Sequence, residues 1–184
     1  MKHKPLSGTR FFFATSPLAC PYLPDKMERR VVSELVGRDA AAMHDALSLA
    51  GYRRSHSIAY APACPDCSAC VAVRVGVDRF TPSRSQRRVW KRNSDIRPAE
   101  VPVTATEAQY AMFVAYQDSR HGDGDMAKMD FHDYRSLVED TSVETMLVEF
   151  HQPDRGLVGA CLLDRIENGL SAVYSFFEPE LIKR

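Results

Sequence analysis

The chain has 184 residues, 45% of them hydrophobic and 26% charged, with 24 basic and 24 acidic side chains. This composition is typical of a soluble globular protein with one sizeable core or two small ones. No apolar run is long enough to span a membrane, and the basic start at residues 1–4 lacks the apolar core of a signal peptide. A cytoplasmic protein without a membrane partner is therefore expected.

The first part of the chain is predicted to combine short strands with one helix. Strands are expected at residues 10–15 and 28–35. Asp39 offers an N-cap to the alanine-rich run 40–50, and Gly51 can end that run. Residues 40–50 are therefore a predicted helix.

Three cysteines lie between two predicted strands, at residues 52–60 and 71–77, and a fourth precedes a proline far upstream. The four positions are Cys20, Cys64, Cys67 and Cys70. Cytoplasmic thiols stay reduced, so the spacing of three residues favours metal binding over disulfides. An iron–sulfur cluster and a zinc ion both suit four thiolates. Buried or free thiols without a metal are the alternative.

A basic helix is predicted at residues 84–93, with Ser83 as its N-cap. Five cations recur at helical spacing on one face, namely Arg84, Arg87, Arg88, Lys91 and Arg92. Val89 and Trp90 lie on the other face. Like charges in a row repel one another, and a phosphate backbone along the row would relieve that repulsion. The stripe therefore indicates a nucleic-acid contact, with a merely solvated basic face as the alternative.

Two further helices are predicted in the second part of the chain. Thr106 and Gln109 have the spacing of a capping box for a helix over 106–120. Asp130 can cap a second helix over 131–138. Both begin at residues whose side chains accept hydrogen bonds from the first helical turn.

Three strands follow these helices, at residues 143–150, 157–165 and 170–177. Asn168-Gly169 between the last two is a hairpin signal, so an antiparallel meander is expected. The proline-flanked stretch 98–102 is interpreted as a linker between an N-terminal domain, 1–97, and a C-terminal domain, 103–184. The predicted fold class is α+β, in two small halves.

Chemistry could reside in two places outside the cysteines and the basic helix. The glycine-broken loop 120–126 contains His121 and Asp123, which can move protons or hold charge, or can simply be surface polar groups. Tyr174 and Ser175 lie in a predicted strand between apolar residues. They could line a pocket or be buried in the core.

Several stretches resemble the arginyl-tRNA protein transferase family, in family order and across nearly the whole chain. Those similar to its N-terminal signature are 51–55, 60–64 and 80–89, and the one similar to its C-terminal signature is 171–179. Residues 120–126 and 148–150 resemble its bacterial branch, the aspartate/glutamate leucyltransferases.

The resemblance implies an enzyme of the N-degron (N-end rule) pathway of protein degradation. Such enzymes move leucine from leucyl-tRNA to the N-terminal α-amine of proteins that begin with Asp or Glu. The expected partners are thus charged tRNA and those proteins, not DNA. The resemblance also implies a GNAT acyltransferase-like C-terminal half. Family members continue beyond Glu178-Pro179, so this half is expected to be incomplete at its C-terminus.

The resemblance also suggests roles for particular residues. Eukaryotic relatives are associated with an iron–sulfur cluster at N-terminal cysteines, and Cys20 and Cys64 occupy comparable places. The aminoacyl ester is already activated, so transfer needs no cofactor, only alignment, a base and donors to the oxyanion. The residues expected to catalyse transfer are Tyr174, Ser175, His121 and Asp123.

The remaining roles are recognition of the two substrates. The five cations of residues 84–92 are expected to bind tRNA phosphates. A fixed cation is needed for an acidic N-terminus, and the candidates are Arg53, Arg54 and Arg120. The alternative from another class is a non-catalytic tRNA- or RNA-binding or metal-sensing module.

Overall fold

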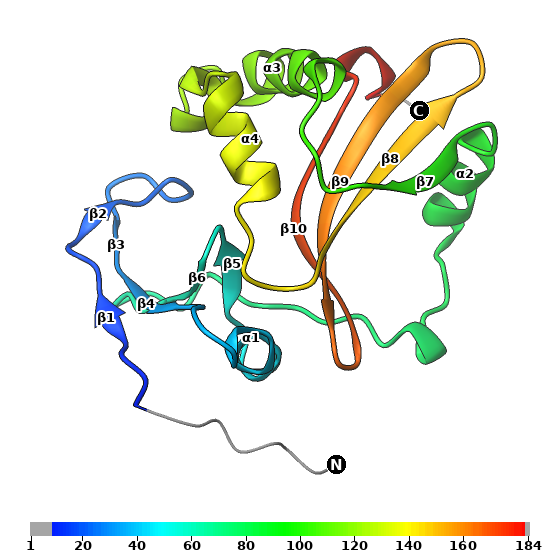
Figure 1. The fold of residues 1–184 in the computed structure, drawn as a ribbon. Helices are drawn as coiled ribbons and strands as arrows, with labels where there is room; N and C mark the ends of the chain where they lie inside the picture. The colour runs from blue at the N-terminus through cyan, green and yellow to red at the C-terminus, as the bar shows by residue number, and fades with distance from the viewer. Residues whose placement is uncertain (1–8, 183–184) are drawn as a thin grey trace. The chain divides into compact units, whose positions relative to one another are not determined.

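The computed structural model describes residues 9–182, which form two compact units (Figure 1). The described part of the first unit runs to Arg74 and includes Thr141–Glu144 and Ile166–Gly169. The second unit holds Val75–Asp140, Thr145–Arg165 and the described residues from Leu170 onward. Two expectations fall on residues outside this range: the absence of a signal peptide at residues 1–4 and the incomplete end at Arg184.

The predicted linker at 98–102 is wrong, because residues 98–101 belong to strand β7 (Arg97–Val101). This strand pairs at the edge of a sheet, where proline is tolerated because no partner needs its missing N–H. The two units instead separate first after Arg74. The predicted ranges 1–97 and 103–184 therefore do not coincide with them.

The first unit is built on a four-stranded antiparallel sheet. Its strand order is β1 (Phe13–Ala14), β4 (Arg30–Glu34), β6 (Ile58–Pro62) and β5 (Arg53–Ser55). Two further strands, β2 (Leu18–Ala19) and β3 (Met27–Glu28), pair separately. Helix α1 (Ala40–Leu49) contributes to a small core made of Leu35, Ala40, Met43, Leu47 and Ala59. The predicted strand at 28–35 and helix at 40–50 are confirmed, and the strand at 10–15 is reduced to β1.

Two predicted strands are wrong, one within this unit and one that runs past its end at Arg74. Residues 52–60 form a hairpin of β5 and β6 rather than one strand, with His56 at the turn in the left-handed region, φ +50°. Residues 71–77 are β-branched and alternating, yet they pair with no strand and lead only into a short 3₁₀ helix, η1 (Val77–Arg79). Val73 is 88% exposed. Strand propensity expresses packing on a sheet, and here the valines find no sheet.

The start of α1 differs in one detail from the prediction. Asp39 occupies the N-cap position, but its side chain makes no capping bond. Its carboxylate accepts a hydrogen bond from Arg10 at 3.1 Å instead, because a guanidinium is a stronger donor than a backbone amide. Gly51 follows the helix with φ +89°, a conformation that glycine adopts without strain.

The second unit contains the predicted meander. Its sheet has the order β10 (Gly169–Phe177), β9 (Gly156–Ile166), β8 (Thr145–Gln152) and β7. The turn between β9 and β10 lies at residues 167–168, one position before the expected Asn168-Gly169. The pairing of β8 with β9 carries an irregularity at Phe150 and His151. The three predicted strands are confirmed, together with an antiparallel arrangement.

All three predicted helices of this unit are present, and each begins with a capping box. They are α2 (Arg84–Arg92), α3 (Glu107–His121) and α4 (Phe131–Glu139). Helices α3 and α4 cover one face of the sheet (Figure 1). The core between them contains Met112, Phe113, Tyr134, Leu137, Val138, Leu147, Ala160, Leu162 and Phe176. Within residues 9–182, no helix combines the length and apolar content needed to cross a membrane.

Candidate functional site

The basic stripe of α2 lies on the surface. All five of its cations are exposed, and the neighbouring Trp90 is 83% exposed. Among the described residues, no acidic side chain pairs with Arg84, Arg87, Arg88 or Lys91. Arg87 donates to the carbonyl of Pro82, within the turn that precedes the helix. The stripe is thus available to a polyanion.

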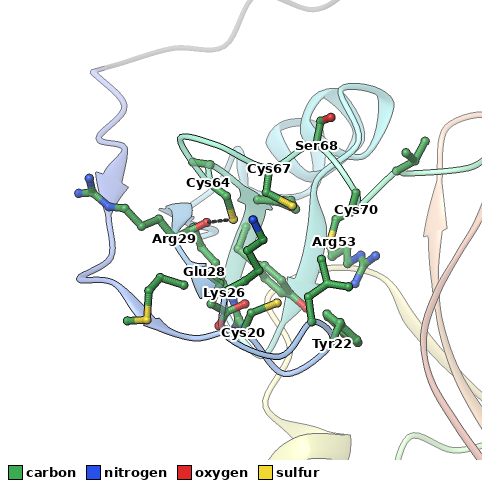
Figure 2. Close-up of a pocket in the computed structure, with 18 residues that line it drawn as sticks. Cys20, Tyr22, Lys26, Glu28, Arg29, Arg53, Cys64, Cys67, Ser68 and Cys70 are labelled. Carbon is green, nitrogen blue, oxygen red and sulfur yellow. Dashed lines mark hydrogen bonds and ion pairs between the residues drawn. The ribbon is translucent and has the colours of Figure 1, made fainter.

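The four predicted metal-ligating cysteines line one cavity of the first unit (Figure 2). Cys20 follows β2, and the other three lie on the loop after β6. The cavity has a volume of about 680 Å³. Cys64 donates from its Sγ to the carbonyl of Arg29 at 3.7 Å. The fold therefore brings the remote Cys20 to the same place as the Cys64–Cys70 run.

Taken three at a time, the cysteine sulfurs of the described residues do not reach the spacing that zinc requires. A tetrahedral zinc site places its sulfurs about 3.8 Å apart, because each lies about 2.3 Å from the metal. In the described part of the chain, no three cysteines have sulfurs within 4.8 Å of one another. An iron–sulfur cluster places several iron and sulfide atoms between its thiolates and so suits a wider cavity.

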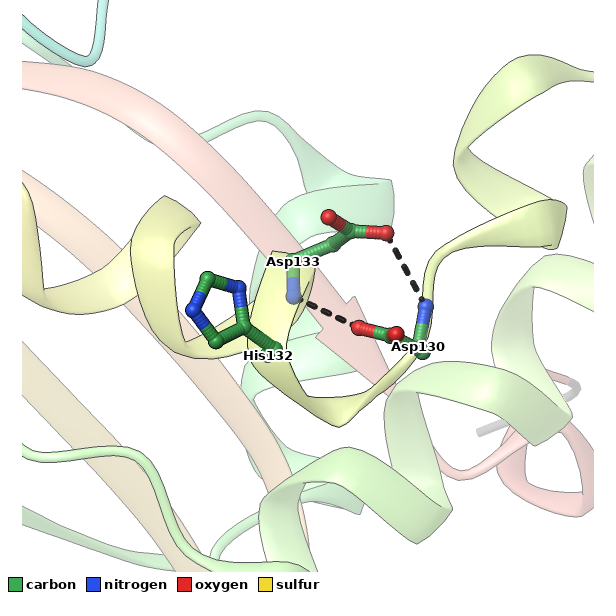
Figure 3. A group of neighbouring side chains, drawn as sticks. All are labelled: Asp130, His132 and Asp133. Atoms are coloured by element: carbon green, nitrogen blue, oxygen red, sulfur yellow. Dashed lines mark hydrogen bonds between the residues drawn. The ribbon is translucent and has the colours of Figure 1, made fainter.

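One acidic group outside the cysteines does meet that spacing, at the start of α4 (Figure 3). It consists of Asp130, His132 and Asp133, all exposed. The Asp130 carboxylate already accepts a hydrogen bond from the backbone N–H of Asp133 at 2.9 Å, and the Asp133 carboxylate accepts one from the backbone N–H of Asp130 at 3.2 Å. Asp130 and Asp133 therefore have a structural role as the capping box of α4.

The structure separates Tyr174 from Ser175, which were predicted to share a pocket. Tyr174 faces α3, where its hydroxyl accepts a hydrogen bond from Nε2 of the buried Gln117 at 2.5 Å. Ser175 is exposed and lines a second pocket. Successive side chains of a strand point to opposite faces, and Tyr174 is not among the residues that line this pocket.

His121 and Asp123 lie at the end of α3 and in the loop beyond it. Both are exposed, and the His121 ring lies edge-on to Tyr116 at 6.1 Å between centroids. Among the described residues, neither side chain is hydrogen-bonded to Tyr174 or Ser175. The four predicted catalytic residues therefore do not form one hydrogen-bonded set.

The three candidate arginines differ in exposure. Arg53 is exposed and lines the cysteine cavity. Arg54 is 5% exposed and donates to the carbonyl of His56 at 2.8 Å, so burial argues against its contact with a substrate. Arg120, in the second unit, is exposed on α3.

A polar network inside the second unit is not evident from the sequence. The Tyr134 hydroxyl donates to Oε1 of Gln109 at 3.4 Å, and Nε2 of Gln109 donates to Glu149 at 2.7 Å. The other carboxylate oxygen of Glu149 lies 2.8 Å from Nε2 of His151. The capping box identified Gln109 only as a helix cap, because a sequence motif does not reveal what the remaining amide atoms meet.

Burial keeps three acidic protons in place. It raises the pKa of Tyr134, with a smaller contribution from the charge of Glu149. It also raises the pKa of Tyr174, an effect that the Gln117 hydrogen bond partly offsets, and that of the Cys161 thiol. At neutral pH the Tyr174 hydroxyl therefore keeps its proton and is not a base.

We expect the free energy of unfolding to fall at alkaline pH. In the unfolded chain cysteine loses its proton at about pH 8.5 and tyrosine at about pH 10, while the folded chain keeps these protons to higher pH. The unfolded state then binds fewer protons, so stability is full below about pH 8 and declines above it, by at most about 1.4 kcal/mol per pH unit for each group. Urea titrations across this range measure the effect. Tyr174→Phe should reduce the alkaline decline, and an unchanged profile would contradict the assignment.

Comparison with known proteins identifies the family. Residues 18–88 match the family described as "Arginine-tRNA-protein transferase, N terminus", and residues 108–184 match "Arginine-tRNA-protein transferase, C terminus". An "Aspartate/glutamate leucyltransferase" of Paramagnetospirillum magneticum is 54% identical over 184 residues, which is 100% of this chain and 75% of that protein. Proteins of the same name from Gluconacetobacter diazotrophicus and Granulibacter bethesdensis are 52% and 51% identical, over 95% and 98% of this chain and 67% and 68% of their own lengths. The chain therefore belongs to the arginine-tRNA-protein transferase family, in the branch of the aspartate/glutamate leucyltransferases.

Proposed function

We infer that the chain transfers leucine from leucyl-tRNA to the N-terminal α-amine of proteins that begin with Asp or Glu. The observation that carries this inference is the 54% identity to a leucyltransferase across the whole chain. The two family matches, which cover both halves in order, support it further. We place this activity in the cytoplasm, within the N-end rule pathway of protein degradation.

The reaction requires no energy source beyond the ester. The lone pair of the neutral α-amine attacks the carbonyl carbon of the leucyl ester, and a C–N bond forms. The bond from that carbon to the ribose oxygen breaks, and the proton lost by the amine ends on that oxygen. Leucyl-protein and free tRNA are the products. The protein has to bind both substrates, align the amine with the ester and stabilise the charge that develops on the carbonyl oxygen.

Transfer RNA is proposed to lie along α2. The exposure of the five cations, four of them without an acidic partner among the described residues, supports this assignment. The exposed face of Trp90 offers a surface on which an unpaired base can stack. Phosphate contacts would hold the RNA without reading its sequence.

Roles near the reacting groups are assigned from the position and exposure of each side chain. Ser175 opens to a pocket, and we assign its hydroxyl to contact with the leucyl ester. Tyr174 then acts as a positioning residue on the opposite face of β10. His121 and Asp123, both exposed, are the candidates for receiving the proton of the amine. The antiparallel sheet with helices on one face is consistent with the GNAT-like fold that we propose for this unit.

Recognition of an acidic N-terminus is proposed to use an exposed arginine. Arg53 and Arg120 meet that condition, and Arg54 does not. A guanidinium can hold a carboxylate through two parallel hydrogen bonds, which a lysine cannot reproduce. Arg53→Lys and Arg120→Lys therefore separate a specific carboxylate contact from a general need for positive charge.

The function is tested by a transfer assay. Leucine labelled on tRNA is incubated with the purified protein and peptides that begin with Asp, Glu or Ala. We expect label in the Asp and Glu peptides and none in the Ala peptide. The Paramagnetospirillum magneticum relative serves as the positive control. Absence of transfer by folded protein, alongside an active relative, would contradict the inference.

A second candidate function is supported by the exposed basic stripe, which needs no catalytic partner to bind RNA. In that case the chain would be an RNA-binding or metal-sensing module without turnover. Measuring tRNA affinity in the same preparations distinguishes the two. Tight, salt-sensitive binding without transfer would favour the module.

We also propose that Cys20, Cys64, Cys67 and Cys70 hold an iron–sulfur cluster, supported by their common cavity and wide spacing. Protein purified without oxygen should then be coloured and contain iron and sulfide. Cys67→Ser should lose the colour and most of the iron. The matched control is Cys161→Ser, which removes a thiol from the other unit and should retain both. Colourless protein without iron would contradict the proposal. Zinc bound instead of iron would show that the cysteines hold a zinc ion and not a cluster.

A further inference from the structure

A second pocket of the structure lies at the meander, where Ser175 opens to solvent. Its volume is about 340 Å³, within the range of small-ligand sites. Phe150 of β8, Gly159 of β9 and Ser175 of β10 line it, together with Leu181 beyond β10. Asn93 and Ile96 also line it, from the end of α2 and the segment that follows. The remaining lining residues are apolar: Val158, Ala160, Phe176, Phe177 and Ile182. All of these residues belong to the second unit.

The chemistry of the lining selects among possible occupants. No charged side chain of the described residues lines the pocket. A guanidinium or a carboxylate buried there would lose its hydration without gaining a partner, which is unfavourable. A branched aliphatic group of a few carbons loses nothing polar and gains burial. The pocket therefore suits a leucyl side chain and disfavours an arginyl one.

The polar groups at the pocket suit the rest of an amino-acid ester. Ser175 offers a hydroxyl, which can donate and accept. Asn93 donates from Nδ2 to the carbonyl of Val89 at 3.0 Å, which leaves its side-chain oxygen as an acceptor. An ester carbonyl needs a donor and an α-amine needs an acceptor. The two residues supply one of each.

The pocket also continues from the basic stripe. Asn93 is the C-cap of α2 and directly follows Arg92, the last cation of the stripe. Both features lie in one unit, so their adjacency is fixed by the local chain. An RNA strand bound along α2 with its 3′ end towards residue 93 would bring its aminoacyl group to the pocket.

We propose that this pocket binds the leucyl side chain of the aminoacyl-tRNA and selects leucine over arginine as the transferred residue. The proposal rests on the proposed function, which it deepens by naming the donor subsite. It assigns donor selection to the lining of Ile96, Phe150 and Gly159. Charge recognition of the tRNA stays with α2.

Gly159 provides the sharpest variant. A Cβ at this position would lie 3.5 Å from the carbonyl oxygen of Phe176 and 3.6 Å from a ring carbon of Phe150. These are ordinary contact distances, so Gly159→Ala should fold while its methyl group occupies space in the pocket. Ile96→Ala changes the pocket in the opposite direction, by removing three carbons from its wall. Leu170→Ala, an exposed apolar site at the far end of β10, is the matched control.

The experiment compares one tRNA charged with leucine, alanine, phenylalanine or arginine. Wild-type protein should transfer leucine best and arginine least. Gly159→Ala should lower kcat/KM for leucine by about 10- to 100-fold and for alanine by less than about threefold, which is the range that methyl-sized changes in a pocket produce. Ile96→Ala should raise kcat/KM for the transfer of phenylalanine relative to that of leucine. Leu170→Ala should change neither ratio, and thermal melting should verify that all three variants fold.

A binding measurement separates this proposal from the function on which it rests. Wild-type protein should bind leucyl-tRNA more tightly than the same tRNA uncharged or charged with arginine, and Gly159→Ala should abolish that preference. If the preference exists without any transfer, the proposed function is contradicted and the pocket is supported. If transfer occurs but Gly159→Ala and Ile96→Ala leave the donor ratios and the preference unchanged, the pocket proposal is overturned.

Discussion

Replacing Arg84, Arg87 and Arg88 together by glutamine is expected to weaken tRNA binding by about 100-fold at physiological salt. The three guanidinium groups are exposed on one face of α2, and no acidic side chain of residues 9–182 neutralises them. Each phosphate contact releases a condensed counterion, so losing three contacts should also lower the slope of log affinity against log salt by about two to three. Filter binding at several salt concentrations measures both quantities.

The control for this prediction is a cation that already has an acidic partner. Lys128 is exposed in the same unit, and its Nζ lies 3.4 Å from a carboxylate oxygen of Asp125. Lys128→Gln should leave the slope unchanged. The triple variant should keep its stability within about 0.5 kcal/mol per site, because exposed side chains pack against little. An unchanged salt slope in the triple variant would show that tRNA binds elsewhere.

The parts of the fold that were predicted correctly are those set by local sequence. Helices α2, α3 and α4 begin where Ser83, Thr106 and Asp130 offer side-chain acceptors, and each acceptor is used. The cap and the first turn lie within four residues of each other, so the signal is contained in the sequence. The strands of the meander were similarly visible from alternation and turn residues.

The errors arose where a segment depends on a distant partner. Residues 71–77 have the composition of a strand, but a strand exists only if another edge accepts its backbone bonds. Residues 98–102 contain two prolines and looked like a linker, yet β8 pairs with them. No local pattern distinguishes a proline-containing edge strand from a connection. Register and pairing had to come from the structure.

The candidate sites follow the same division. Helical spacing placed the cations of α2 on one face, and the structure leaves them exposed. The expectation that Cys20 approaches Cys64 is consistent with the cavity that both line. The apolar pocket was missed, because Phe150, Gly159 and Ser175 meet only through the pairing of three strands. Tyr174 and Ser175 are neighbours in the sequence, but in the structure Tyr174 contacts Gln117 of α3 while Ser175 lines the pocket, as the alternation of side chains along a strand favours.

Replacing Gln109 by alanine is expected to lower the free energy of unfolding by about 2–4 kcal/mol. Its buried amide satisfies three groups at once: the Thr106 backbone N–H at 3.0 Å, Glu149 at 2.7 Å and the Tyr134 hydroxyl at 3.4 Å. Alanine leaves that hydroxyl without an acceptor and Glu149 with one fewer donor. Urea unfolding measures the loss.

Gln86 of α2 provides the matched control for this variant. Its side chain accepts the same capping bond, from the Ser83 N–H at 2.8 Å, but it is exposed and has no further hydrogen bond to the described residues. The bond to the Ser83 side chain comes from the backbone N–H of Gln86, which alanine keeps. Gln86→Ala should therefore cost only about 0.5–1 kcal/mol, the value of a helix cap. Equal losses in the two variants would mean that the buried bonds of Gln109 contribute nothing.

Gln109→Glu tests the direction of the bond to Glu149. The new side chain keeps an acceptor for Thr106 but replaces the donating amide by a carboxylate that faces Glu149. Two carboxylates at this distance cannot both stay charged without repulsion, so the variant should be less stable than Gln109→Ala at neutral pH. Protonation of one carboxyl restores a donor, so the deficit relative to wild type should shrink as the pH falls towards about 5. His151 contacts Glu149 in both proteins, so the comparison is made with wild type at each pH. A deficit that is independent of pH would show that the amide of Gln109 is needed for its packing and not for its hydrogen bond.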